Sequence, residues 1–329
     1  MNPRPLVPAL TAAVAAVTLT ACGTVSTGGS EAASTDGYPV EVSTCGRDVT
    51  IGAVPKRVVS MHPSLTELLV QLGVGDRVVA QAQDALGDPS PELARQVDRI
   101  PSISKDTPPT KEDVLKQDPD LVVSGTEYEF NAEAGFADYK TLDQVGIQAY
   151  VAKAGCIDRR SQGTVADTFS DVEALGRVFG VEDRAREIVA DAKDDLDEVA
   201  GIVGDDDPVP AAQVYVEGGK LYAIGGAVEI DVLRLGGGRN LFAGDSRFSD
   251  FFAAEVNPEV VLSKRPQALV FAYNDAKHEK ATLAYLRSRL ADTPAVRSGT
   301  LVGVDNTRVQ PGTLAAIRGA RQVAEALHG

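Results

Sequence analysis

From Val58 onward, short runs of β-branched residues alternate with segments whose apolar residues recur at helical spacing. Alternation of this kind is typical of βα units built around a mostly parallel sheet. The predicted strands cover Val58–Ser60, Arg77–Ala80, Leu121–Ser124 and Gln148–Val151, and the predicted helices cover Ser64–Leu72, Lys111–Gln117 and Tyr139–Val145. We therefore expect residues 45–163 to form an α/β lobe.

A long helical pattern follows this lobe. Its apolar residues keep helical spacing from Val165 to Ile202, well beyond the length of an average helix, until an Asp-Asp-Asp-Pro sequence at 205–208 ends it. A second alternation then begins, with predicted segments at Gln213–Val216, Glu229–Leu235, Ala268–Phe271, Leu301–Val304 and Leu314–Leu327. We expect residues 164–204 to form one helix that joins the first lobe to a second α/β lobe at 205–329, and a length of 329 residues suits two domains.

Residues 1–44 indicate the cellular compartment of the protein. Leu6 to Thr20 form an apolar stretch of signal-peptide size, shorter than the roughly 20 residues of a spanning helix. The stretch ends in Leu19-Thr20-Ala21-Cys22, which resembles the bacterial lipobox, and a run rich in Gly, Ser and Thr follows. We predict a signal peptide at 1–21, a lipidated Cys22 and a flexible tether at 22–44. The protein would then be lipid-anchored on the extracytoplasmic face of the cell membrane, the periplasmic side if an outer membrane is present. The alternative is an ordinary signal peptide with an incidental cysteine.

Two cysteines remain once Cys22 is set aside. Cys45 and Cys156 form an even pair in an oxidising compartment, where thiols tend to couple. We interpret the pair as a structural disulfide, and the alternative is two unrelated buried thiols. A metal site is disfavoured because neither cysteine stands in a CxxC or Cys-x-His spacing.

Charge and composition exclude several classes of function. With 32 basic and 47 acidic side chains the chain carries a net charge of −15, and it contains 5% aromatic residues and no Trp, so nucleic acid is not an expected partner. Three histidines disfavour direct capture of a bare metal ion. A hydrolase is the competing class, but the chain has no Gly-x-Ser-x-Gly sequence, and we predict neither catalysis nor a bound cofactor.

A short sequence pattern occurs once in each half of the chain. Glu112 stands seven residues before Pro119, Glu259 stands seven residues before Pro266, and a predicted strand follows each proline. Each glutamate lies just inside a predicted helix start, where a carboxylate stabilises the helix dipole by roughly 0.3–1 kcal/mol. This stabilisation of the helix start would by itself explain why a glutamate occurs at both positions.

Four motifs, taken in order, carry a family resemblance. They read RVVSMHPSLTELL at 57–69, LGVGDRVV at 72–79, PDLVV at 119–123 and LGGGRNLF at 235–242, with the long helical pattern and the second Glu-x6-Pro unit completing the set. Together they resemble the substrate-binding proteins of ABC importers for iron-siderophores, haem and cobalamin. The resemblance spans nearly all of residues 45–329.

The resemblance implies two Rossmann-like α/β lobes with mostly parallel sheets, joined by a single long α-helix, with a ligand cleft between the lobes. It implies that Glu112 and Glu259 dock onto the permease dimer, which works with its ATPase subunits. It also implies an extracytoplasmic lipoprotein that captures a ferric siderophore, with cobalamin or haem as the alternative ligands. Glu67, which also recurs in the family pattern, is interpreted as structural.

The ligand residues are expected in loops that follow the predicted strands, where α/β sheets bind their ligands. Aromatic faces and a cation would suit the apolar rim and anionic oxygens of an iron chelate. For the tyrosines the alternative is packing near a sheet edge, and for the histidine it is a role at a helix start. The candidates are His62, Tyr128, Tyr222, Arg247 and Tyr273.

Overall fold

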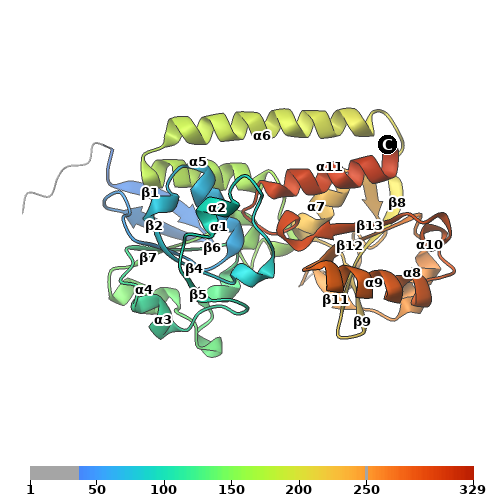
Figure 1. The fold of residues 1–329 in the computed structure, drawn as a ribbon, viewed down its shortest axis with the longest axis horizontal. Coiled ribbons are helices and arrows are strands. Elements are labelled where there is room, and N and C mark those ends of the chain that lie inside the picture. Colours follow the sequence, from blue (N-terminus) through green and yellow to red (C-terminus); the bar gives the residue numbers. More distant parts are fainter. Residues whose placement is uncertain (1–36, 249–250) are drawn as a thin grey trace, which may run out of the picture. The chain divides into compact units, whose positions relative to one another are not determined.

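The structure is a computed structural model that describes residues 37–248 and 251–329. Predictions about the signal peptide, Cys22 and most of the tether lie outside the described residues. The described residues belong to one compact unit, and within it two sheets and their helices form two lobes (Figure 1). No helix in the described ranges is long and apolar enough to cross a bilayer.

The first lobe is built on a five-stranded parallel sheet of order β5-β4-β3-β6-β7. Runs such as Leu-Val-Val-Ser form its buried central strands, because both faces of the sheet are covered. Three of the four predicted strands match the structure end to end, the fourth is shifted by one or two residues at its ends, and one short strand was not predicted. The strands are β3 (Val58–Ser60), β4 (Val78–Ala82), β5 (Ser102–Ser104), β6 (Leu121–Ser124) and β7 (Gln148–Val151), and the helices are α1 (Pro63–Gln71), α2 (Ala94–Val97), α3 (Lys111–Leu115) and α4 (Tyr139–Gln144).

The second lobe has a six-stranded sheet that is only partly parallel. Strands β8, β10, β12 and β13 run parallel, whereas β9 pairs antiparallel with β8, and β11 pairs antiparallel with β9. The alternating pattern did not predict β9 and β11. The strands are β8 (Val209–Glu217), β9 (Lys220–Ile224), β10 (Gly238–Asn240), β11 (Ala253–Glu255), β12 (Ala268–Tyr273) and β13 (Leu301–Asp305), and the helices are α7 (Ala227–Leu235), α8 (Pro258–Lys264), α9 (Ala276–Arg289), α10 (Pro294–Ser298) and α11 (Ala315–His328).

The linking segment is two helices, α5 (Asp167–Phe179) and α6 (Glu182–Val203), where one continuous helix was predicted. Gly180 adopts a left-handed conformation with φ 68°, which ends α5 and turns the chain. Figure 1 shows α6 alone running past both lobes. Ile188 and Val189 of this helix are buried in the core of the first lobe, and Ala192 and Val199, further along it, are buried in the core of the second. The lobes are therefore joined by a shared apolar helix face.

A β-hairpin precedes the first lobe. Strands β1 (Val40–Thr44) and β2 (Arg47–Ile51) pair antiparallel around a two-residue turn, Cys45 and Gly46, whose φ angles of 47° and 70° suit a tight hairpin. The predicted tether therefore ends before residue 40 and not at 44. The alternating residues of the hairpin, Val42, Val49 and Ile51, face the core of the first lobe and make it part of the folded unit.

The structure contains a disulfide between Cys45 and Cys156, with their Cα atoms 5.0 Å apart and 111 residues of separation along the chain. Closing so long a loop restricts the unfolded chain and is expected to stabilise the fold by about 4–5 kcal/mol in the chain-entropy account. Denatured, unreduced protein that lacks Cys22 should show no free thiol on titration. Two free thiols would contradict the disulfide.

Candidate functional site

A cavity of about 840 Å³ lies where the two lobes meet. Its walls follow the carboxyl ends of strands β3, β6 and β7 in the first lobe, together with residues of the second lobe, the usual place for a ligand site in an α/β sheet. Aromatic side chains provide much of the lining. They are Tyr128, Phe130 and Tyr139 from the first lobe and Phe251 and Phe252 from the second.

A smaller cavity of about 420 Å³ adjoins the large one. His62, Leu86 and Gln310 line both cavities, so they form the boundary between them. The smaller cavity is more polar and includes Glu67 in its wall. Glu67 accepts hydrogen bonds from the backbone N–H (2.7 Å) and hydroxyl (3.0 Å) of Ser90, which supports the structural interpretation of this residue.

His62 caps helix α1 and faces both cavities. Its Nδ1 accepts a hydrogen bond from the Ser64 backbone N–H at 3.3 Å and lies 2.8 Å from the Ser64 hydroxyl. An accepting Nδ1 places the hydrogen of the neutral ring on Nε2. Burial lowers the pKa of His62, an effect that Glu129 opposes and Arg160 reinforces. His62 therefore presents an uncharged N–H donor.

Glu127 joins two parts of the cavity wall. One carboxylate oxygen accepts a hydrogen bond from the Tyr139 hydroxyl at 3.1 Å, and the other accepts from the Ile157 backbone N–H at 2.7 Å. Burial and the neighbouring Glu127 carboxylate raise the pKa of Tyr139, so this phenol stays neutral. Its ring stacks on Phe130 with centroids 4.7 Å apart, which gives the cavity a flat apolar surface.

Arg160 supplies the cation of the large cavity. Its guanidinium lies 4.7 Å from the centre of the Phe252 ring. Within residues 37–248 and 251–329 no carboxylate forms an ion pair with it. Its donors therefore remain available to an anionic group in the cavity, and guanidinium is well suited to paired oxygen acceptors.

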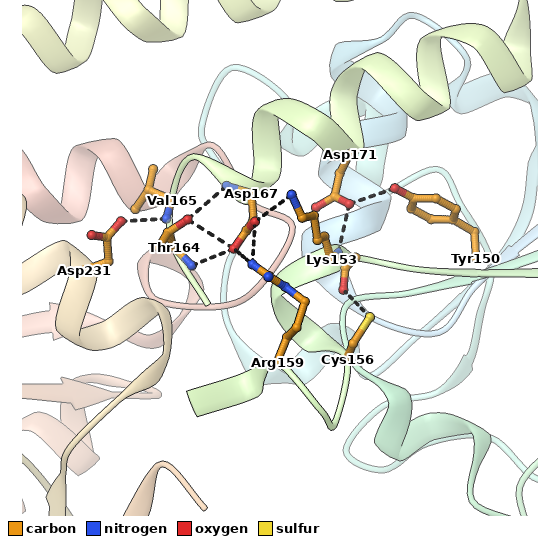
Figure 2. A network of polar contacts seen from close by, with 10 residues as sticks. Tyr150, Lys153, Cys156, Arg159, Thr164, Val165, Asp167, Asp171 and Asp231 are labelled. Atoms are coloured by element: carbon orange, nitrogen blue, oxygen red, sulfur yellow. Dashed lines mark hydrogen bonds and ion pairs between the residues drawn. The ribbon is translucent and has the colours of Figure 1, made fainter. Parts of the chain in front are cut away.

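The segment that carries Arg160 is held by a polar network (Figure 2). The neighbouring Arg159 forms an ion pair with Asp167 at 2.9 Å, and the Lys153 ammonium lies 3.1 Å from the same carboxylate. Asp171 accepts hydrogen bonds from the Tyr150 hydroxyl (2.7 Å) and the Lys153 backbone N–H (2.9 Å), and burial raises the pKa of Asp171 to about 7. The network thus connects the loop after β7 to the start of α5.

The structure unites only part of the predicted ligand set. His62 and Tyr128 line the large cavity, whereas Tyr273 lines a separate cavity of about 310 Å³ beside Asp84 and Asp305. Tyr222 lies on β9 opposite Glu255 of β11, outside both adjoining cavities. Tyr222 was expected in a loop, whereas in the structure it lies within a strand.

Arg247 also lies outside both adjoining cavities, so the structure does not bring it together with His62 and Tyr128. Its guanidinium pairs with Asp245 at 2.6 Å and lowers the pKa of that carboxyl to about 2. Lining residues of the large cavity that the sequence did not predict include Arg160, Tyr139, Phe252 and Gln310. Arg160 stands nine residues beyond β7, so only a search further along the loop would have found it.

Glu112 and Glu259 occupy matching positions in the two lobes. Each lies in the first turn of a short helix, α3 or α8, capped by Thr110 or Asn257. Both glutamates are exposed, and neither lines the two adjoining cavities. In the view of Figure 1, α3 and α8 lie in different lobes on the side away from α6. The helix-start explanation and a docking role are both compatible with this placement.

The sequence pattern of the periplasmic binding protein family matches residues 58–307, and the chain belongs to this family. The resemblance carried by the motif order is thereby confirmed. The chain is 29% identical over 189 residues to the uncharacterized ABC transporter substrate-binding lipoprotein YvrC of Bacillus subtilis, covering 56% of this chain and 55% of that protein. The aligned region thus spans only about half of that relative.

Two further comparisons cover more of the chain. A cobalamin-binding protein of Halobacterium salinarum is 24% identical over 288 residues, which cover 85% of this chain and 71% of that protein. A crystal structure described as an ABC-type Fe³⁺-hydroxamate transport system from Saccharomonospora viridis superposes with a TM-score of 0.73 and 25% identity, covering 89% of this chain and 100% of that one. The expected two-lobe α/β fold is confirmed.

Proposed function

We propose that this protein is the substrate-binding lipoprotein of an ABC importer and that it captures a ferric siderophore in the large cavity. The observation that carries the ligand assignment is the combination of an aromatic wall with the unpaired guanidinium of Arg160. Hydroxamate and catecholate chelates have apolar rims and negatively charged oxygens, so both features would contact the same ligand. The similarity to the Fe³⁺-hydroxamate transport structure supports this assignment.

Cobalamin is the second candidate. The Halobacterium relative, named a cobalamin-binding protein, aligns over 85% of this chain, which is the observation in its favour. Haem, the third, would also use the flat aromatic wall. We favour the siderophore because the Fe³⁺-hydroxamate transport structure is similar over 89% of this chain, and because the anionic oxygens of an iron chelate would contact Arg160.

Delivery would require a permease dimer with its ATPase subunits. We propose that Glu112 and Glu259, one on each lobe, contact the two permease subunits. A lipid anchor on Cys22 would keep the protein at the membrane near this partner. Residues 37–39 lead directly into the hairpin, so a tether from Cys22 would end at the folded unit.

A ligand panel tests the proposal. Protein lacking the signal peptide and Cys22 is mixed with iron(III)–desferrioxamine, haemin or cyanocobalamin, and melting temperature and calorimetric affinity are measured. The iron chelate should raise the melting temperature, because a ligand at 100 times its Kd stabilises the folded state by about 2.7 kcal/mol. Binding of cyanocobalamin or haemin in place of the iron chelate would contradict the siderophore assignment and favour the corresponding alternative.

A further inference from the structure

The hairpin β1–β2 is joined to the first lobe close to the large cavity, although none of its residues lines that cavity. Thr44, the last residue of β1, both donates to the Val151 carbonyl and accepts from the Val151 N–H through its hydroxyl, each at 2.9 Å. The next residue, Cys45, forms the disulfide with Cys156. The turn of the hairpin is thus attached to the end of β7 and to the loop that follows it.

Cys156 begins a segment that enters the cavity wall. Ile157, Arg160 and Ser161 all line the large cavity, within five residues of the disulfide. Ile157 is 73% exposed, so packing against the core does not hold its side chain. The covalent link at Cys156 therefore restrains the segment that presents Arg160.

The disulfide also lies on a closely packed path to His62. A Cβ atom on Gly155 would come within 1.8 Å of the Gly125 carbonyl oxygen, so the backbones after β6 and β7 are in direct contact. Gly125 in turn packs on the His62 ring, where a Cβ atom would lie 2.9 Å from Nδ1. A shift of the chain at Cys156 would therefore displace the loop that packs on the His62 donor.

A second attachment runs from the hairpin to the aromatic wall. The guanidinium of Arg47, the first residue of β2, lies 4.0 Å from the centre of the Tyr139 ring and 3.3 Å from the Asp143 carboxylate. Tyr139 lines the large cavity and shares Glu127 with Ile157. The two attachments of the hairpin thus meet at Glu127.

We propose that hairpin β1–β2 is a positioning element for the large cavity, which it holds in a binding-competent form through Cys45 and Arg47. This inference depends on the proposed function in one respect, namely that the ligand binds in this cavity. Preorganised walls lower the entropy lost on binding, so loosening them weakens affinity without removing a ligand contact. Ligand affinity should consequently depend on the oxidation state of the disulfide.

The first test compares oxidised and reduced protein. A water-soluble trialkylphosphine cleaves the S–S bond, supplies two electrons and becomes the phosphine oxide, while the two sulfurs take up protons from water. Hydrogen–deuterium exchange should then rise in residues 153–163 and 125–144. The Kd for iron(III)–desferrioxamine should increase about tenfold, as expected when a supporting contact of a binding site is lost. The melting temperature and near-ultraviolet circular dichroism report whether the reduced protein remains folded.

Arg47→Ala provides a test that leaves the disulfide intact. Exchange should rise in residues 138–144, and the Kd should increase in the same direction as on reduction. The matched control is Glu41→Ala, an exposed position on the same hairpin, which should leave exchange in the cavity wall and the Kd unchanged.

The proposal would be overturned if hydrogen–deuterium exchange in the cavity wall stayed unchanged both after reduction and in Arg47→Ala. This holds whether or not the Kd for the chelate changes. Faster exchange with an unchanged Kd for a chelate that binds would overturn it as well. If the reduced protein unfolds, Arg47→Ala alone decides. If no member of the ligand panel binds, the proposed function fails, and the exchange data still decide whether the hairpin positions the wall.

Discussion

The double variant Glu112→Arg/Glu259→Arg should bind its ligand with wild-type affinity and yet fail to support uptake. Both glutamates are exposed in the first turns of α3 and α8, and neither lines the adjoining cavities. The ion pair of Glu112 with Lys111, at 3.9 Å, is of the exposed kind that contributes about 0–1 kcal/mol, and each helix-start carboxylate contributes roughly 0.3–1 kcal/mol, so the melting temperature should fall only modestly. At an interface, by contrast, close charge pairs have couplings of about 1.5–7 kcal/mol.

The measurement is ligand uptake by cells and stimulation of the transporter's ATPase in reconstituted membranes. Glu41→Arg/Glu187→Arg is the matched control, because it makes the same change in net charge at two other exposed glutamates and should keep uptake intact. Each single variant should lose part of the activity if the two lobes dock on two subunits. Normal uptake by the double variant would return both carboxylates to the helix-start explanation.

Replacing Arg160 with Ala should produce the largest loss of affinity among single substitutions in the large cavity. A hydrogen bond to a charged group contributes about 1.5–3 kcal/mol, which corresponds to a roughly 10- to 150-fold higher Kd for an anionic iron chelate. Arg160→Lys should recover only part of the affinity, because an ammonium cannot make the paired contacts of a guanidinium. Calorimetric titration with an anionic tris-catecholate chelate, iron(III)–enterobactin, measures all three proteins.

Arg247→Ala is the matched control for this experiment. It removes the same side chain from a position outside the adjoining cavities, where Asp245 already pairs with it. Its Kd should equal that of the wild type. A weaker Arg247→Ala variant and an unaffected Arg160→Ala variant would place the anion site at Arg247 and show that the large cavity is not where the chelate binds.

The strands and helix starts were predictable because their causes are local. Leu121–Ser124 and Gln148–Val151 are short runs with β-branched and apolar residues that match β6 and β7 end to end. Thr110 and Asn257 cap helices through their own side chains, so their neighbours in the sequence are sufficient to identify them. The cysteine pair could be inferred from the compartment, since two thiols were left to couple.

The break in the linking helix and the antiparallel strands of the second sheet do not follow from the periodic pattern. Helical periodicity continues through Gly180, but the left-handed backbone there ends α5, and α6 then packs against both lobes. Strand β9 pairs with β8 as a hairpin across the turn of Gly218 and Gly219, and the alternation of strands and helices along the chain does not reveal it.

The tertiary structure also decided which loop side chains line the large cavity. Arg160 and Arg247 are both loop arginines in the sequence, and nothing local distinguishes them. In the fold, Asp245 pairs with Arg247, whereas the disulfide and the Arg159–Asp167 ion pair hold the segment of Arg160 at the cavity wall. The sequence by itself determined which elements form and the order in which they follow one another, because capping and side-chain patterns act over a few residues. The packing of the two lobes decided which side chains share a cavity, because that depends on where loops from distant parts of the chain meet.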